Sequence, residues 1–143
     1  MSETIIDPAQ LVPHPVPVVP IARVLLYAMR RMAIGGLDDA HAANVLMGQL
    51  GMNYRRPLVI LRALMLEVSR TSERSISIAP CCCLRMTADE ASLLGAVEVA
   101  VARPEVARTL MARITATLDC LAPVSAAQAL NHAFADLGRP LAL

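Results

Sequence analysis

Hydrophobic residues recur along most of the chain at the 3.6-residue period of amphipathic helices. Glycine or proline stands at most of the boundaries of these periodic segments, where such residues commonly end or begin a helix. The pattern therefore predicts an all-α fold, a bundle of about six helices. The expected helices span residues 21–34, 38–50, 57–70, 87–102, 104–121 and 126–137.

Each expected helix has an apolar face for the core and a polar face for solvent. In the helix at 21–34, the side chains expected on the solvent face are Arg23, Tyr27, Arg30 and Arg31. In the helix at 104–121, the stripe expected to be buried consists of Ala107, Leu110, Met111, Ile114, Leu118 and Leu121. The helix at 57–70 is the most apolar element, and we expect it at the centre of the bundle.

Two of the expected helices begin with recognisable capping residues. Asp38 precedes the second helix, and an aspartate there accepts hydrogen bonds from the unpaired amides of the first turn. Thr87 and Glu90 have the spacing of a capping box, in which each side chain bonds the backbone amide of the other residue. We therefore expect these two helix starts to be well defined.

Two segments lack the helical period. Residues 1–20 contain five prolines, which remove backbone donors and favour extended backbone, so we expect a proline-rich N-terminal arm. Residues 71–79 include the alternation Ser75, Ile76, Ser77, Ile78, which predicts a short extended segment before the cysteines. The chain has a suitable length for one core, so we expect a single helical domain over residues 21–143.

The composition supports a helical core and argues against a polyanionic partner. Hydrophobic residues make up 56% of the 143 residues and aromatic residues only 2%, so aliphatic side chains and methionine must fill the core. The formal net charge is +1, and all the fixed side-chain cations are arginines. This balance does not favour nucleic acid as the partner, although a local basic face remains compatible with it.

The sequence shows neither a secretory signal nor a membrane span. The N-terminal end is acidic and then proline-rich, unlike a secretory signal. The most hydrophobic stretch, residues 16–34, is interrupted by prolines and arginines, so it does not read as a membrane-spanning helix. We therefore expect a cytoplasmic protein that has no contact with a membrane, in which thiols stay reduced or bind metal.

Three consecutive cysteines, Cys81, Cys82 and Cys83, follow Pro80 and precede the Thr87 capping box. Adjacent Cα atoms are about 3.8 Å apart, below the usual Cα separation in disulfides, so bridges between neighbouring cysteines would be strained. If the segment is extended, Cys81 and Cys83 face one side and Cys82 the other.

Three uses of these cysteines remain open from the sequence. The favoured one is burial as small apolar side chains beneath the loop. Metal binding, with zinc as the candidate ion, would combine Cys81 and Cys83 with ligands from elsewhere, for which Cys120, His41 and His132 are the candidates. Redox or nucleophilic use is the third, since a helix N-terminus and Arg85 stand nearby.

A second local pattern concerns DNA. Residues 49–53 followed by residues 61–64 resemble the turn and the second helix of helix-turn-helix DNA-binding domains. The resemblance covers about residues 43–64 and implies Arg55, Arg56 and Arg62 as candidate DNA contacts. Pro57 and the apolar residues after it, at positions that would face the DNA groove, depart from that pattern.

Over nearly the whole chain beyond the arm, the sequence resembles an uncharacterised family of small bacterial proteins. The resemblance rests on residues 56–59 (RPLV) with 61–64 (LRAL), residues 79–83 (APCCC) with 85–87 (RMT), and residues 135–140 (ADLGRP). It implies a single intact domain, and it implies no activity, cofactor or site residue.

These observations favour a protein that acts without catalysis. We expect it to work by self-association or by binding a protein partner, because a helical domain rich in small apolar residues often leaves apolar surface for a partner. The alternative is a metal or thiol-redox function at Cys81 to Cys83, and the third is DNA binding.

Overall fold

The computed structural model describes residues 14–142, and most of them are helical, as the pattern predicts. A 3-10 turn, η1 (Gly51–Tyr54), joins α3 to α4, and two short strands, β1 (His14–Pro15) and β2 (Arg85–Met86), pair antiparallel. The helices are α2 (Pro20–Gly35), α3 (Ala40–Leu50), α4 (Arg55–Thr71), α5 (Ala88–Val99), α6 (Pro104–Thr115) and α7 (Leu121–Asp136).

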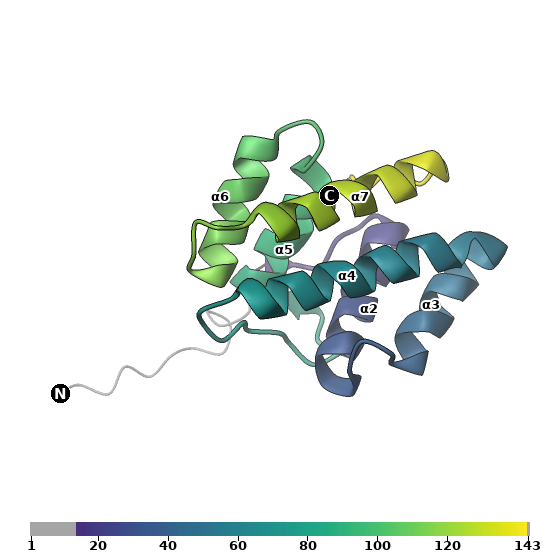
Figure 1. Ribbon diagram of the computed structural model, residues 1–143. Coiled ribbons are helices and arrows are strands. Elements are labelled where there is room, and N and C mark those ends of the chain that lie inside the picture. Colours follow the sequence, from purple (N-terminus) through teal and green to yellow (C-terminus); the bar gives the residue numbers. More distant parts are fainter. Residues whose placement is uncertain (1–13, 143) are drawn as a thin grey trace.

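The helices pack in pairs around one apolar core. As Figure 1 shows, α4 runs alongside α7, α5 lies against α6, and α2 lies against α3. The core is built from aliphatic side chains and methionine, with a single phenylalanine, as the composition requires. Its largest fully buried apolar side chains are Leu25, Met29, Leu46, Leu61, Leu64, Leu94, Met111, Ile114, Leu130 and Phe134. None of the helices between residues 14 and 142 combines the length and apolar character needed to cross a membrane.

The start of α3 differs from the sequence prediction by one residue. The cap is Asp39, whose Oδ1 accepts hydrogen bonds from the amides of His41 and Ala42 at 2.9 and 3.1 Å. Asp38, the predicted cap, has a side chain that is 97% exposed. Asp39 is favoured because its carboxylate also receives the Arg31 guanidinium, at 3.1 Å, while it caps the helix.

The end of α6 is also earlier than predicted. Ala116 adopts the left-handed conformation, with φ 58°, and its amide bonds the carbonyl of Ala112, so the helix stops at Thr115. Leu118 and Leu121, predicted to be buried on this helix, are 94% and 71% exposed. The chain after the turn enters α7 at Leu121, five residues before the predicted start at residue 126.

The predicted proline-rich arm lies only partly within the described residues. Residues 1–13 of the arm fall outside them, and residues 14–19 lead through β1 into α2. Residues 72–79, predicted to be extended, have no helix and no strand. The short strand of this region comes instead at Arg85 and Met86, after the cysteines, and it pairs with β1.

The largest departure from the sequence prediction is Arg30, which was expected on the solvent face of α2 and is only 2% exposed. Its Nε donates to Glu90 Oε2 at 2.6 Å and its Nη2 to Glu90 Oε1 at 3.1 Å. Glu90 is also 2% exposed, and its Oε1 accepts the Thr87 amide at 2.9 Å. The capping box of α5 is present as predicted, and its glutamate serves two purposes, since it caps α5 and neutralises Arg30.

A second arginine reaches the same turn of α5. Arg74 places its guanidinium on both carboxylate oxygens of Asp89 at 3.1 Å, and it donates to the Ile114 carbonyl at 2.6 Å. Asp89 also accepts the Ser77 amide at 2.8 Å. The irregular segment at 72–79 is therefore tied to the start of α5 and the end of α6.

Removal of Arg30 should be costly, because it leaves the Glu90 carboxylate buried without its counter-charge. We expect Arg30→Met to lower the free energy of unfolding by about 3 to 5 kcal/mol. Arg56→Met removes the exposed Arg56–Asp136 pair and is the control, for which we expect a loss of about 1 kcal/mol or less. Urea unfolding followed by circular dichroism measures both, and equal losses would contradict the role given to Arg30.

Asp39 should make the free energy of unfolding depend on pH in the acidic range. The hydrogen bond from Arg31 is the main cause that holds the pKa of Asp39 below its ordinary value of 3.8. Because the pKa of Asp39 is lower in the folded than in the unfolded protein, its charge contributes fully to stability at pH values above the pKa of the unfolded state. This contribution is lost as the pH falls through the pKa of the folded state. We expect Asp39→Asn, which keeps a capping oxygen but not the charge, to be less stable than wild type at neutral pH.

This difference should shrink as the pH falls below 3.8, the ordinary pKa of the carboxyl group. Denaturant unfolding at a series of pH values measures it. Asp38→Asn, at the exposed neighbouring carboxylate, is the matched control and should show a much smaller difference. A difference for Asp39→Asn that stays constant down to the lowest pH would contradict this prediction.

Candidate functional site: the cysteine turn

Residues 80–83 form a turn that we call the cysteine turn. The amide of Cys83 donates to the carbonyl of Pro80 at 3.0 Å, the hydrogen bond that closes a β-turn. The segment is therefore a tight turn and is not extended. Cys81 and Cys83 are half-buried and Cys82 is exposed, so the favoured prediction that all three are buried filler is wrong.

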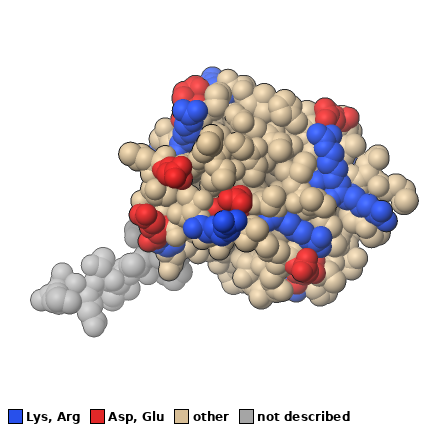
Figure 2. Space-filling view, in the orientation of Figure 1, with Lys and Arg blue, Asp and Glu red and all other residues tan. Residues whose placement is uncertain are grey.

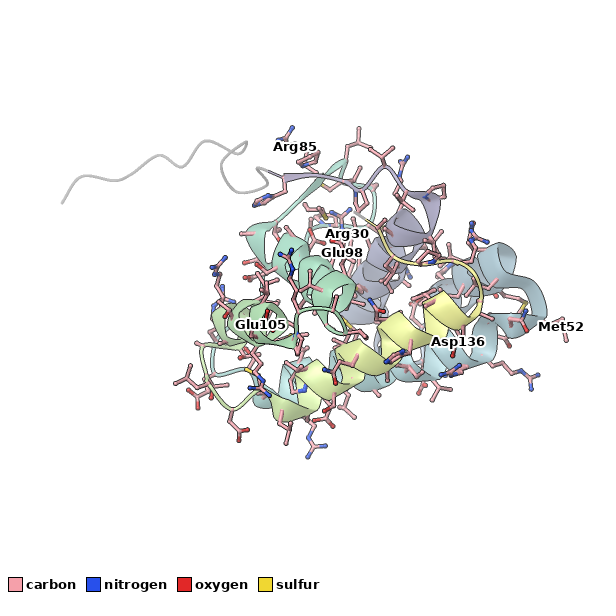
Figure 3. The ribbon with its side chains drawn as sticks, turned by 90° about the horizontal axis from the view of Figure 1, so that it is seen from above. Arg30, Met52, Arg85, Glu98, Glu105 and Asp136 are labelled. Carbon is pink, nitrogen blue, oxygen red and sulfur yellow. The ribbon has the colours of Figure 1, made fainter. Side chains whose placement is uncertain are left out.

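The buried Arg30 holds the chain that follows this turn. Its Nη1 donates to the carbonyl of Cys83 and its Nη2 to the carbonyl of Arg85, each at 2.7 Å. Figure 3 shows Arg30 in the interior of the molecule, whereas Arg85 lies at its edge. Because one guanidinium binds Glu90 and both carbonyls, the position of the cysteine turn is set by the core and not by the loop alone.

The cysteine turn borders a small cavity of about 240 Å³. Arg23 and Tyr27 of α2 line it from one side, and no aspartate or glutamate is among the described residues that line it. The Arg23 side chain is exposed and makes no ion pair with any residue between 14 and 142. The cavity therefore has a positive charge and three thiols. Its lining is Val16, Arg23, Leu26, Tyr27, Arg30, Cys81, Cys82, Cys83 and Leu84.

A second arginine of α2, Arg31, links this turn to the start of α3. Its hydrogen bond with Asp39 is the main cause that raises the pKa of Arg31, and the nearby Cys81 side chain raises it further. The Arg31 guanidinium therefore stands near the side of the turn that carries Cys81.

The candidate metal ligands do not meet at one point among the described residues. Cys120 is buried between α6 and α7, where its sulfur lies 3.4 Å from the Thr115 hydroxyl and 3.1 Å from the Thr117 carbonyl oxygen. His41 is exposed in the first turn of α3. Within residues 14–142 there is no group of three or more histidine, cysteine, aspartate or glutamate side chains placed to hold a metal ion. The zinc site at Cys81, Cys83, Cys120 and His41 stays a prediction from the sequence.

The three arginines predicted to contact DNA have different surroundings. Arg56 is paired with Asp136 of α7 at 2.8 Å. Arg62 donates to the carbonyl of Leu37 at 2.8 Å and lies 3.8 Å from the Asp38 carboxylate. Arg55, which opens α4, is exposed. Two of the three are therefore bonded within the molecule, and DNA binding stays a prediction.

The contribution of α2 to this site is not predicted from the sequence, which places Arg23, Tyr27 and Arg30 on the solvent face of the helix. Arg23 is exposed as expected, whereas Tyr27 is half-buried and Arg30 is buried, and all three line the cavity. A signal was present, because Ala22 and Leu26 precede Arg30 by eight and four residues and are buried with it. A second apolar row ending in an arginine indicates a helix covered on two faces.

A comparison with models of protein families shows the family of this chain. The model of the Family of unknown function (DUF6628) matches residues 8–139, so the chain belongs to this family. This confirms the resemblance to an uncharacterised family. No curated protein and no solved structure gave a significant match.

The exposures of the four sulfurs predict an order of thiol labelling. We expect a soluble maleimide to modify Cys82 fastest, Cys81 and Cys83 more slowly, and Cys120 slowest, because only Cys120 is buried and bonded at its sulfur. Peptide mapping by mass spectrometry after timed labelling of the native protein measures the four rates. Denatured protein, in which the four rates should become similar, is the control. Fast labelling of Cys120 in the native protein would contradict this placement.

Proposed function

Within this family of unknown function, we propose that the chain acts without catalysis and that two copies associate through the exposed face of α4. The observation that carries the proposal is a stripe of apolar residues on this face. Val59, Ala63 and Leu66 are exposed, and Val59 and Leu66 are 61% and 41% exposed. Their spacing of four and then three residues places them on one side of the helix. We call these three residues the α4 stripe.

A groove borders this stripe. It has a volume of about 410 Å³ and lies between the C-terminal halves of α2 and α4 and the irregular segment at 72–79. Leu66 belongs to both the stripe and the groove, and Met32 and Met65 line the groove with flexible side chains that adapt to a packed partner. The apolar part of its lining includes Met32, Leu37, Met65, Leu66, Ile76, Ile78 and Leu93.

Two further features support a second copy as the occupant. A two-fold axis brings the same surface of two copies together, so an apolar stripe on one helix is complementary to itself. The net charge of +1 creates little repulsion between copies. Figure 2 agrees with this, because the charged side chains on the visible face stand in small, mixed groups separated by uncharged surface.

The decisive measurement is the mass of the full chain in solution over a wide concentration range, by light scattering coupled to size exclusion. We expect a dimer that dissociates on dilution. Leu66→Glu should weaken the association by about tenfold or more, since an uncompensated charge in an apolar contact costs over 1.4 kcal/mol.

The matched control is Leu118→Glu, which adds the same charge at a leucine that is 94% exposed in the connection between α6 and α7. It should leave the association unchanged, and circular dichroism should show that both variants fold. A monomer at all concentrations would overturn the proposal, and so would equal weakening by the two substitutions.

A further inference from the structure

The middle cysteine of the cysteine turn differs from its neighbours in two respects. Cys82 is exposed, whereas Cys81 and Cys83 are half-buried. The thiols on both sides of Cys82 belong to its direct neighbours, Cys81 and Cys83. A disulfide between adjacent residues is strained. Any disulfide that Cys82 forms with a small molecule is therefore protected from attack by the neighbouring thiols.

The flanking pair behaves differently. Cys81 and Cys83 are separated by one residue and stand at the second and fourth positions of the turn. Two peptide units separate them, so a disulfide between them lacks the strain of one between adjacent residues. A mixed disulfide with a small molecule on either cysteine is therefore open to attack by the thiol of the other. The cluster thus contains one thiol that retains an adduct and two that lose it as an internal disulfide.

The charge around the turn selects the class of adduct. Cys82 and Arg23 line the same cavity, and no carboxylate among the described residues does so. The Arg23 guanidinium has no ion pair within residues 14–142 to compete with an incoming anion. An arginine in this position favours a small molecule that carries carboxylates.

We propose that Cys82 is a site of reversible S-thiolation by an anionic low-molecular-weight disulfide, whose carboxylate is received by Arg23. The Cys82 thiol loses its proton to solvent, and its sulfur attacks one sulfur of the small disulfide. A bond forms between these two sulfurs, the original disulfide bond breaks, and the other half leaves as a thiolate. One disulfide is consumed and one is formed, so the exchange needs no other oxidant.

The test uses the reduced, full-length protein and two disulfides of opposite character. Glutathione disulfide is the anionic probe, and bis(2-hydroxyethyl) disulfide is the neutral one. Intact-protein mass spectrometry gives the rate of adduct formation with each, and peptide mapping gives its position. We expect the first stable adduct on Cys82 with both probes, and its release by excess thiol.

Arg23→Gln should slow the reaction with glutathione disulfide by about two- to fivefold, the effect of one exposed charge pair, and leave the neutral probe unaffected. Arg108→Gln, at an exposed arginine of α6, is the matched control and should change neither rate. Cys82→Ser should abolish the stable adduct and leave only the internal disulfide of the flanking pair. Arg23 and Cys82 are both exposed, so circular dichroism should show native folding in each variant.

Three results would overturn the proposal. The first is a stable adduct that maps to Cys81, Cys83 or Cys120 in the wild-type protein. The second is a disulfide between Cys82 and an adjacent cysteine in place of the adduct. The third is an equal effect of Arg23→Gln on both probes, which would mean that Arg23 does not receive a carboxylate.

Discussion

The buried ion pair between Arg30 and Glu90 is the contact on which the arrangement of this protein depends. The guanidinium joins α2, the first turn of α5 and the backbone on both sides of Leu84 through hydrogen bonds of 2.6 to 3.1 Å. A charge in the interior requires such partners, since desolvation of an unpaired guanidinium or carboxylate costs several kcal/mol. No buried side-chain nitrogen or oxygen within residues 14–142 lacks a hydrogen-bond partner, so this requirement is met. The position of the cysteine turn follows from the core.

The residues that fix the position of the candidate site therefore differ from the residues proposed to react or bind a ligand there. Arg30 is fully occupied by two carbonyls and a carboxylate, which makes it a support for the turn. Arg23, two turns before Arg30 on the same side of α2, is exposed and has no ion pair among the described residues. The two arginines of α2 differ in their environment. The buried Arg30 supports the structure, and the exposed Arg23 is the one available for recognition. The α4 stripe is a separate surface, on another helix.

The sequence predicted the helical character and several element boundaries because these depend on local signals. The Thr87 and Glu90 capping box lies within four residues, and it is present as expected. The burial of Arg30 could not be read in the same way, because its partner Glu90 is 60 residues distant and an arginine on a helix ordinarily faces solvent. The pairing of His14 with Met86 involves strands of two residues, too short for any alternation to be seen. Leu118 and Leu121 continued the period of α6 in sequence, but Ala116 had already ended the helix.

Asp89 and Glu90 are neighbours in the chain, and they receive Arg74 and Arg30 from two different segments. Between these anchors, residues 74–87 are attached at Arg74, Ser77, Cys83, Arg85 and Thr87, although residues 75–84 have no helix or strand. An irregular path with so many fixed points has few ways to move without breaking a bond to a buried charge. Irregular geometry here is compatible with rigidity. A thiol displayed on such a segment is held at one place on the surface, as a side chain on a helix would be.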